Sequence, residues 1–304
     1  MHYYPVLIFP GAHPGCLMRG TSVLILILSF LALAGCSSGP SKDEVAATRT
    51  TGSAYGSPGY AGGGRSFAGN PAALRFAQHM ETRHGFDADA VSAILARANR
   101  EAWIIEQMDK PVRKRSGPEV PTGAWNRYRA KFITPDNVAK GVEFWQRHAA
   151  DLRRASAKFG VPPEIIVGII GVETRWGRVM GKTRIIDALA TLSFAYPRRA
   201  EYFTGELESF LLMVRDEGID PFEPRGSFAG AMGYGQFMPS SIRNYAVDFN
   251  GDGHRNLWNA VDAIGSVANY FKGHGWRTGE RGGLRYALPV SAYADVGRWP
   301  LGAS

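Results

Sequence analysis

One carboxylate stands out in this sequence because it interrupts a strongly apolar run. Glu173 lies in the stretch Val161–Gly177, which reads VPPEIIVGIIGVETRWG and opens with two prolines, as the first turn of a helix often does. The glutamate completes an i, i+3, i+4, i+7 pattern whose other members are Ile166, Ile169 and Ile170. We therefore expect a mostly buried helix that ends near Gly177 and carries Glu173 on its apolar stripe.

The apolar setting determines what chemistry we expect of Glu173. Burying a carboxylate costs free energy unless the group is paired or protonated, so burial raises its pKa. The negative end of the helix dipole acts in the same direction. A glutamate that is protonated near neutral pH can serve as a general acid toward a glycosidic oxygen. The alternative is a structural ion pair with Arg175 or another arginine, and the helix alone leaves both interpretations open.

A second stretch of interest is rich in glycine. Residues 226–241 read GSFAGAMGYGQFMPSS, and the small residues allow a ligand to approach the backbone closely. Ser227, Tyr234 and Gln236 add hydrogen-bonding groups. The stretch contains neither a GK[ST] signature nor a GxGxxG signature after a strand, so we do not expect a nucleotide site.

A third stretch, residues 248–259, reads DFNGDGHRNLWN and matches the start of an EF-hand calcium loop. Oxygen-bearing side chains occupy positions 1, 3 and 5 and a glycine occupies position 6, namely Asp248, Asn250, Asp252 and Gly253. Position 12 is Asn259 instead of the usual glutamate, and Asp262 could replace it in a longer loop. A turn without metal is the alternative. We favour a structural calcium ion.

The N-terminal part is typical of an exported lipoprotein. A short apolar run, Val23–Ala34, follows Arg19 and is too short to span a membrane. It ends in LAGC, which resembles the signal of bacterial lipoproteins and makes Cys36 the lipidated residue. We expect residues 1–35 to be a signal peptide, with Met18 as a more normal start. No aspartate follows the cysteine, which by the same resemblance favours the periplasmic face of the outer membrane.

The composition narrows the remaining possibilities. The formal net charge of +8 suits an acidic polymer, a membrane surface or nucleic acid, but no nucleic-acid-binding motif is visible, so we expect no nucleic acid. The two cysteines, Cys16 and Cys36, both precede the folded region, which excludes a disulfide core there. Residues 36–70 are rich in Gly, Ser, Ala and Pro and read as a flexible tether. We expect residues 71–304 to form the folded domain.

Hydrophobic periodicity in the folded region predicts a mainly α protein, with at most a minor hairpin. The segments predicted to be helical are 72–83, 87–100, 138–159, the stretch that contains Glu173, 185–192, 199–215 and the segment after Asp262. Arg198 and Arg199 stand at a helix start, where the dipole disfavours cations, which weakly suggests that they bind an anion. Two ordinary surface arginines are the alternative.

Together these stretches resemble the lytic murein transglycosylases of the membrane-bound B family. The resemblance runs from about Pro71 to Trp276 and rests on GVETRWG at 171–177, AMGYGQFMPSS at 231–241 and the calcium-like loop. It implies a goose-lysozyme-like helical core with an added helical N-terminal part and a small EF-hand-like calcium loop. It also implies cleavage of peptidoglycan between N-acetylmuramic acid and N-acetylglucosamine, without water, to leave 1,6-anhydro-muramoyl ends.

The resemblance also implies residue roles. Glu173 would be the sole catalytic acid and base, aided by the acetamido group of the substrate, with no cofactor for catalysis. The substrate-binding residues would be Ser227, Gln236, Tyr128, Tyr270, Arg198 and Arg199. The calcium ligands would be Asp248, Asn250, Asp252, the His254 carbonyl and Asp262. Peptidoglycan strands would be the main partner, and the sequence leaves enzymes of cell-wall synthesis open as further partners.

The chain departs from the family pattern after Trp276. Family members continue with a further helical portion, whereas residues 277–304 do not align with it, so we expect a domain truncated at its C-terminus. Two other functions stay open on this basis. One is a lysozyme-like hydrolase, which requires a second carboxylate. The other is a non-catalytic lipoprotein that binds peptidoglycan.

Overall fold

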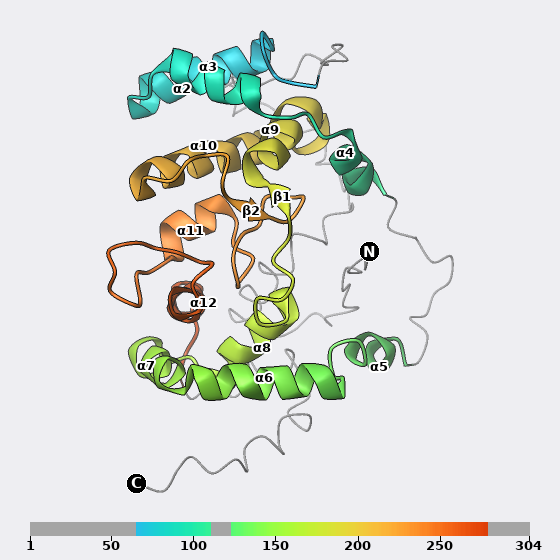
Figure 1. Ribbon diagram of the computed structural model, residues 1–304, viewed down its shortest axis with the longest axis vertical. Coiled ribbons are helices and arrows are strands. Elements are labelled where there is room, and N and C mark those ends of the chain that lie inside the picture. Colours follow the sequence, from blue (N-terminus) through green and yellow to red (C-terminus); the bar gives the residue numbers. More distant parts are fainter. Residues whose placement is uncertain (1–64, 111–122, 279–304) are drawn as a thin grey trace, which may run out of the picture.

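The computed structural model describes residues 65–110 and 123–278, and most of this part is helical (Figure 1). The prediction of a mainly α fold is confirmed. The predicted signal peptide, Cys36 and the tether up to residue 64 lie outside the described residues, as do residues 279–304. The helices are α2 (Pro71–His84), α3 (Ala88–Arg97), α4 (Ala102–Asp109), α5 (Ala124–Arg129), α6 (Pro135–Arg147), α7 (Ala149–Phe159), α8 (Pro163–Thr174), α9 (Ile185–Ala195), the 3-10 turn η1 (Pro197–Arg199), α10 (Ala200–Glu217), α11 (Pro239–Tyr245) and α12 (Ala260–Gly273).

The helix boundaries follow local capping chemistry. The Asn70 side chain accepts hydrogen bonds from the backbone N–H groups of Ala72 and Ala73, and it thereby starts α2. Gly85 ends α2 in the left-handed conformation (φ 67°), which glycine adopts without a steric penalty. Asp87 caps α3 in the same way as Asn70 caps α2, as its position in the sequence predicts.

The helices form layers around a shared core (Figure 1). The α2–α3 pair lies against α9 and α10, which pack along one another. At this junction the Phe194 ring meets the rings of Phe67 and Phe76 edge-on, at 5.6 and 5.9 Å between ring centroids. On the other side of the molecule, α12 packs on α7 and α8, and α6 packs on α8. The Glu173 helix therefore lies between the C-terminal helix of the described region and the α6–α7 layer.

Some boundaries differ from the prediction. Residues 138–159 were expected to form one helix, but the chain leaves the helical conformation at His148 (φ −112°, ψ 23°) and forms α6 and α7 instead. The sequence offers no glycine or proline at this break, so pattern reasoning could not find it. Pattern reasoning also missed α4, α5 and α11, which are 6 to 8 residues long. Helices this short depend on tertiary packing more than on their own periodicity.

Two short strands pair in the described part of the chain, but they are not the predicted minor hairpin, because α9, η1 and α10 lie between them in the sequence. β1 (Thr183–Arg184) pairs antiparallel with β2 (Arg225–Gly226), with Thr183 opposite Gly226. β1 comes shortly after the Glu173 helix, and β2 leads directly into the glycine-rich stretch. The pairing therefore fixes the start of that stretch relative to the chain that leaves α8.

Across residues 65–110 and 123–278, no single helix has the length and apolarity to cross a membrane. The pair α7 and α8 passes that test only when the two are taken together, and they meet at a bend of 114°.

Candidate active site

The C-terminal end of α8 presents Glu173 in an unusual backbone setting. The helix ends at Thr174, earlier than the predicted Gly177, and the chain then turns through left-handed φ values at Arg175 (52°), Trp176 (57°) and Gly177 (87°). Two consecutive non-glycine residues in this region are uncommon and cost conformational free energy. Such strain persists only where the surroundings enforce it, and it occurs directly after the candidate acid.

The Trp176 side chain helps to enforce this turn. Its indole N–H donates a hydrogen bond to the carbonyl of Val167 at 3.1 Å, so the ring folds back along the helix. The ring lies so close to Gly141 on α6 and Gly171 on α8 that a Cβ atom would come within 2.7 and 2.5 Å of it, respectively. The two glycines therefore form the slot that seats the tryptophan, and the tryptophan fixes the chain that follows Glu173.

Glu173 itself has the electrostatic character that the sequence predicted. Its side chain is only partly exposed, and no residue in the described part of the chain makes a hydrogen bond or salt bridge to its carboxylate. The protein atoms packed around the carboxylate displace water and raise its pKa from 4.5 to about 7. An acid of this kind is half protonated near neutral pH.

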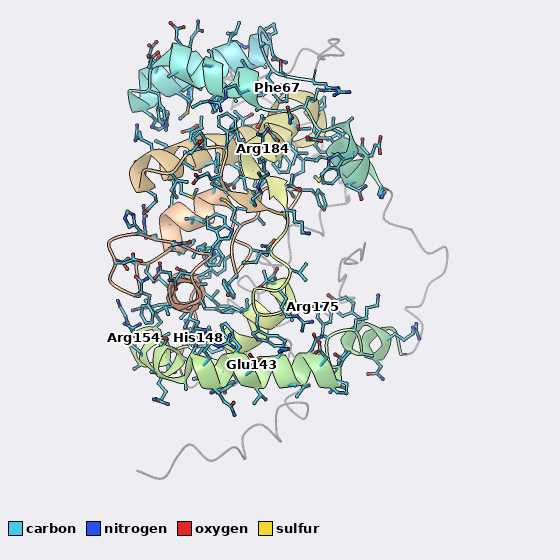
Figure 2. All side chains as sticks on the ribbon, viewed as in Figure 1. Phe67, Glu143, His148, Arg154, Arg175 and Arg184 are labelled. Carbon is cyan, nitrogen blue, oxygen red and sulfur yellow. The ribbon has the colours of Figure 1, made fainter. Side chains whose placement is uncertain are left out.

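Among residues 65–110 and 123–278, no arginine forms the alternative structural ion pair with Glu173. Arg175 follows Glu173 by two residues, yet the two side chains form no salt bridge, and the Arg175 Nε is buried without a hydrogen-bond partner among the described residues. Figure 2 shows Arg175 at the end of α8. Its charge contributes to lowering the pKa of the Asp136 carboxyl on α6, after the larger effect of Arg178, which donates to Asp136 at 2.9 Å.

The glycine-rich stretch docks onto the end of the Glu173 helix. The Thr174 hydroxyl donates to the Tyr234 carbonyl at 2.9 Å and accepts from the Gly177 N–H at 3.1 Å. A Cβ atom at Gly177 would lie 2.4 Å from the Tyr234 ring, so only glycine fits there. The backbone N–H of Tyr234 donates to the Leu257 carbonyl at 2.9 Å, which joins the glycine-rich loop to the calcium-like loop at 248–259.

Ser227 and Gln236, predicted from the resemblance, lie in this docked loop. The Ser227 hydroxyl accepts from the backbone N–H groups of Ala229 and Ala231 at 3.3 and 3.0 Å. Gln236 has a left-handed φ of 49°, and its Nε2 donates to the carbonyls of Met180 and Gly233 at 3.2 and 2.9 Å. Both side chains therefore organise the loop next to α8, where a contact with substrate is compatible with their positions.

The predicted Arg198 and Arg199 lie together on η1. Arg198 is exposed and donates to Asp109 on α4 at 3.1 Å, which leaves the guanidinium accessible but paired. Arg199 lies over the Tyr202 ring at 4.4 Å from its centroid. The structure thus places both arginines at the junction of α4, η1 and α10.

The two predicted tyrosines lie on different elements. Tyr128, on α5, is partly buried, with its ring 5.1 Å from that of Phe132. Tyr270, on α12, is only 6% exposed and lies in an aromatic cluster, stacked on His274 at 4.0 Å and close to Tyr245 at 5.1 Å. Burial raises the pKa of Tyr270 to about 12. The described contacts of Tyr270 are packing contacts.

Sequence reasoning missed a second buried glutamate near the loop. Glu206, on α10, accepts hydrogen bonds from the backbone N–H and the hydroxyl of Ser240, at 2.9 and 2.7 Å. Ser240 lies in the first turn of α11, directly after the glycine-rich loop. Burial raises the pKa of Glu206, against the opposing effect of the Ser240 hydrogen bonds. Phe203, Glu206, Leu207 and Phe210 show the same i, i+3, i+4, i+7 pattern that identified Glu173, so the signal was present.

The calcium-like loop connects α11 to α12 and brings its acidic residues together. The carboxylates of Asp248, Asp252 and Asp262 place ligand oxygens within 4.8 Å of one another. Asp248 accepts from the N–H groups of Gly251, Asp252 and Gly253, which wraps the loop around it. Asp262 is fully buried in the first turn of α12 and accepts from the backbone of residues 249, 250 and 256. This donor set fits a hard divalent cation.

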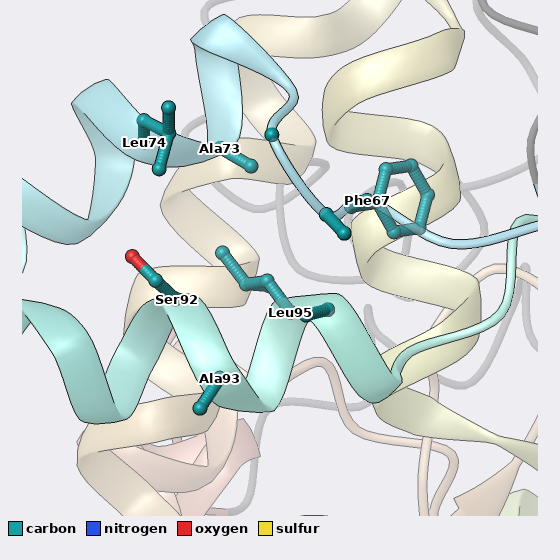
Figure 3. Close-up of a pocket in the computed structure, with 9 residues that line it drawn as sticks. Phe67, Ala73, Leu74, Ser92, Ala93 and Leu95 are labelled. Atoms are coloured by element: carbon teal, nitrogen blue, oxygen red, sulfur yellow. The ribbon is translucent and has the colours of Figure 1, made fainter.

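A pocket of about 260 Å³ lies far from these groups, between α2, α3 and the segment before α2 (Figure 3). It is lined by apolar and small side chains, including Phe67, Leu74 and Leu95. None of the predicted site residues borders it, so it is not the place where Glu173 would act.

Comparison with known proteins identifies the class to which this fold and site belong. Residues 69–298 match the family model described as "Transglycosylase SLT domain". The chain is also 59% identical over 270 residues to membrane-bound lytic murein transglycosylase B of Escherichia coli K12, and the match covers 84% of this chain and 73% of that protein. The chain belongs to the lytic murein transglycosylases of this family.

Solved structures agree with this assignment. The E. coli lytic transglycosylase SLT35, solved in complex with calcium, is 65% identical, with a TM-score of 0.66, over 71% of this chain and 67% of that one. SltB3 of Pseudomonas aeruginosa, solved with NAG-anhNAM-pentapeptide, is 32% identical, with a TM-score of 0.58, over 68% of this chain and 53% of that one. The resemblance predicted a helical fold of the lytic transglycosylase type, and the match to SLT35 confirms this prediction.

Proposed function

We propose that this protein cleaves the β-1,4 bond between N-acetylmuramic acid and N-acetylglucosamine in peptidoglycan and leaves 1,6-anhydro-muramoyl ends. One observation carries the proposal: the Glu173 carboxylate is partly buried, lacks a partner in the described part of the chain, and has a pKa of about 7. A structural carboxylate would be paired or hydrogen-bonded, because burying an unpaired one costs free energy. A carboxylate used in proton transfer is better left unpaired, with its pKa near the working pH.

In this mechanism Glu173 acts twice. Its protonated form first donates a proton to the glycosidic oxygen, and the bond to the muramoyl C1 breaks. The acetamido group of the substrate stabilises the resulting positive charge at C1. The Glu173 carboxylate then removes the proton of the muramoyl C6 hydroxyl, whose oxygen bonds to C1 and closes the anhydro ring. The glutamate ends the cycle protonated, as it began.

The surroundings of Glu173 favour this route over hydrolysis. Glycosidases that use water usually rely on two carboxylates on either side of the scissile bond. Among the residues that the structure describes, burial is the cause of the raised pKa of Glu173, and no neighbouring carboxylate contributes to it. A single acid and base is consistent with an internal nucleophile, the C6 hydroxyl.

The docked loop and η1 would hold the glycan strand. We assign Ser227 and Gln236 to sugar contacts, because both lie in the loop that Thr174 joins to the Glu173 helix. We assign Arg198 and Arg199 to the carboxylates of muramoyl groups or stem peptides, and Tyr128 and Tyr270 to the walls of the site. Peptide-bearing glycan fragments bound to P. aeruginosa SltB3 support a substrate of this class.

We further propose that the loop between α11 and α12 holds one calcium ion with a structural role. Asp248, Asn250, Asp252, the His254 carbonyl and Asp262 would supply the oxygen ligands. The convergence of three carboxylates and the calcium complex of E. coli SLT35 support this assignment. The ion would stiffen the segment whose Leu257 carbonyl holds Tyr234.

We also propose that Cys36 carries a lipid that anchors the protein to the periplasmic face of the outer membrane. The name of the E. coli relative, which describes it as membrane-bound, supports a membrane association. The tether predicted after Cys36 would let the domain reach the peptidoglycan layer.

The proposal is tested by digesting purified peptidoglycan with the wild type, Glu173→Gln and Glu164→Gln. Glu164 is an exposed glutamate in the first turn of the same helix, so its substitution is a matched control. We expect soluble muropeptides from the wild type and Glu164→Gln, and a loss of at least about 100-fold for Glu173→Gln. Equal activity in all three proteins would refute the assignment of Glu173.

A further inference from the structure

A second cluster of titratable side chains lies away from the candidate active site, between α2 and α10. It consists of His79 and His84 from α2 and Glu208 from α10. The His79 Nε2 lies 3.2 Å from one Glu208 carboxylate oxygen, and the His84 Nε2 lies 2.6 Å from the other. One donor atom from each of the three residues lies within 4.8 Å of the other two. Two imidazoles thus face a single carboxylate from the same helix.

We propose that His79, His84 and Glu208 form a binding site for one divalent transition-metal ion, with Zn²⁺ as the best fit. Imidazole nitrogen and carboxylate oxygen are the ligand types that Zn²⁺ binds in proteins, whereas Ca²⁺ and Mg²⁺ prefer oxygen alone. The cluster is therefore chemically distinct from the oxygen-only loop at 248–262. The inference does not depend on the proposed cleavage reaction.

Each imidazole lies near the distance from a Glu208 oxygen that a zinc site requires, and the two imidazoles face different oxygens of the carboxylate. Ligand bonds to Zn²⁺ are about 2.0–2.2 Å long, so two ligands of a tetrahedral ion lie roughly 3.3 Å apart. The separation between His79 and Glu208 already has this value, at 3.2 Å. The His84 Nε2 would have to withdraw by about 0.7 Å, and His84 is the last residue of α2, where the helix gives way to Gly85. The second carboxylate oxygen or a water molecule would complete four ligands.

The charges around the cluster also suit a cation. Each Glu208 carboxylate oxygen faces one imidazole, so the cluster offers carboxylate oxygen beside two ring nitrogens. The opposing group is Arg83, whose Nε lies 3.8 Å from Glu208, but its side chain is 67% exposed and can turn into solvent. The neighbouring Arg215 donates to the His84 carbonyl instead.

The position of the cluster gives a bound ion a structural consequence. The side chains of His79, His84 and Glu208 are 20–27% exposed, so an ion can reach them without unfolding. α2 belongs to the N-terminal helical pair and α10 to the core. A metal ion bound to the folded protein alone would stabilise it and would join these two parts.

The test uses the full chain without a histidine tag, saturated with Ca²⁺ so that the oxygen-only loop is occupied. Co²⁺ serves as the first probe, because tetrahedral Co²⁺ with nitrogen ligands absorbs visible light far more strongly than Co²⁺ with six oxygen ligands. We expect an absorption band that saturates at one equivalent of Co²⁺ and is removed by one equivalent of Zn²⁺. We also expect Zn²⁺ to raise the thermal unfolding midpoint.

The variants separate metal binding from the existing hydrogen bonds. His79→Gln can still donate a hydrogen bond to Glu208 but is a poor metal ligand, so we expect a stable protein with at least a tenfold weaker affinity for Zn²⁺. His84→Ala should lose binding as well, whereas Gln78→Ala, an exposed neighbour on α2, should bind as the wild type does. The proposal is overturned if the Co²⁺ band is absent, or if it persists unchanged in His79→Gln and His84→Ala.

Discussion

At the scale of single residues, the proposed chemistry depends on one acid, Glu173, which has no hydrogen-bond or ion-pair partner among the residues that the structure describes. Glu173 has no described partner, while the residues after it are tightly fixed by Thr174 hydrogen bonds and by the Trp176 slot. The raised pKa and the enforced turn occur in adjacent residues. The described neighbours thus fix the backbone next to Glu173 without forming a hydrogen bond or ion pair with its carboxylate.

The raised pKa of Glu173 predicts a specific dependence of stability on pH. The folded value of about 7 exceeds the ordinary value of 4.5, so the folded state binds the proton more tightly than the unfolded state. Stability is therefore lost as the pH rises from about 4.5 to 7, by on the order of 3 kcal/mol. Glu173→Gln removes this loss, so we expect the variant to be more stable than the wild type at pH 8 and similar at pH 4.

Urea unfolding of both proteins across this pH range measures the effect, and Glu164→Gln provides the exposed control. A wild type that is at least as stable as Glu173→Gln at pH 8 would show that the carboxylate has a stabilising partner after all.

The same pKa predicts that kcat/KM falls above about pH 7, because the first step needs the protonated acid.

The main features of Glu173 could be predicted from the sequence. The interrupted apolar pattern identified Glu173 and predicted its raised pKa, which the structure confirms. The sequence could not decide whether Arg175 pairs with Glu173, because the answer depends on the left-handed turn at 175–177. That turn is enforced by a tryptophan that packs on a glycine in another helix, Gly141, 35 positions away.

At the scale of elements, the central feature is the docking of the glycine-rich loop onto α8. β1, β2 and the Thr174 hydroxyl hold one end and the middle of the loop, and Glu206 holds the helix that follows it. The sequence predicted the helices with long apolar patterns, but the break at His148 and the short helices follow from packing. The pairing of β1 with β2 involves two residues from each strand, which is too short for a periodic signal.

Glu206→Ala tests the role of α10 in holding the loop. It removes the acceptor for both Ser240 donors, so we expect the free energy of unfolding to fall by about 2–3 kcal/mol. We also expect a lower kcat, because Ser240 lies in α11, which directly follows the glycine-rich loop. Glu206→Gln keeps one acceptor and should lose less. Glu201→Ala, an exposed change in the first turn of the same helix, should leave both quantities nearly unchanged. The free energy of unfolding and kcat are measured for all three variants. If Glu201→Ala and Glu206→Ala had equal stability and equal kcat, Glu206 would not be holding the loop.

Two glycine substitutions test how closely the start of the glycine-rich loop approaches the chain at Gly181. Gly181 has a φ of +88°, and a Cβ atom there would lie 2.0 Å from the Gly226 carbonyl oxygen, so Gly181→Ala should destabilise the protein by about 2 kcal/mol or more. Gly205, on α10, has no atom within 4 Å of such a Cβ, so Gly205→Ala should stabilise the protein by about 0.5–1 kcal/mol. Thermal unfolding measures both changes, and equal effects would indicate that the loop does not approach Gly181 closely.

At the scale of the whole molecule, the fold combines the helix that carries Glu173, the docked glycine-rich loop and the calcium-like loop in one packed unit. α12 carries Asp262 in its first turn and packs on α8, so this helix connects the proposed calcium site to the helix that carries Glu173. The mainly α class and the family could be predicted from sequence. The mutual arrangement could not, because it depends on contacts between segments more than 30 residues apart, such as that of Thr174 with Tyr234.

Calcium should stabilise the whole domain. A free Ca²⁺ concentration of about 100 times Kd adds about 2.7 kcal/mol to the stability of a protein that binds only when folded. We expect Ca²⁺ to raise the unfolding midpoint, EGTA to lower it, and Asp252→Asn to weaken the response. Asp216→Asn, an exposed acid on α10, is the matched control. Identical midpoints with Ca²⁺ and with EGTA would rule out a structural calcium ion.

Digestion of peptidoglycan in H₂¹⁸O distinguishes the muramoyl C6 hydroxyl from water as the nucleophile that completes the reaction. If the muramoyl C6 hydroxyl of the substrate closes the ring, mass spectrometry will find products about 18 Da lighter than their reducing-end counterparts, with no ¹⁸O. Glu173→Gln should give neither kind of product. Muropeptides that carry one ¹⁸O at the reducing end would mean that water completes the reaction, and they would contradict the account of Glu173 as a lone acid and base.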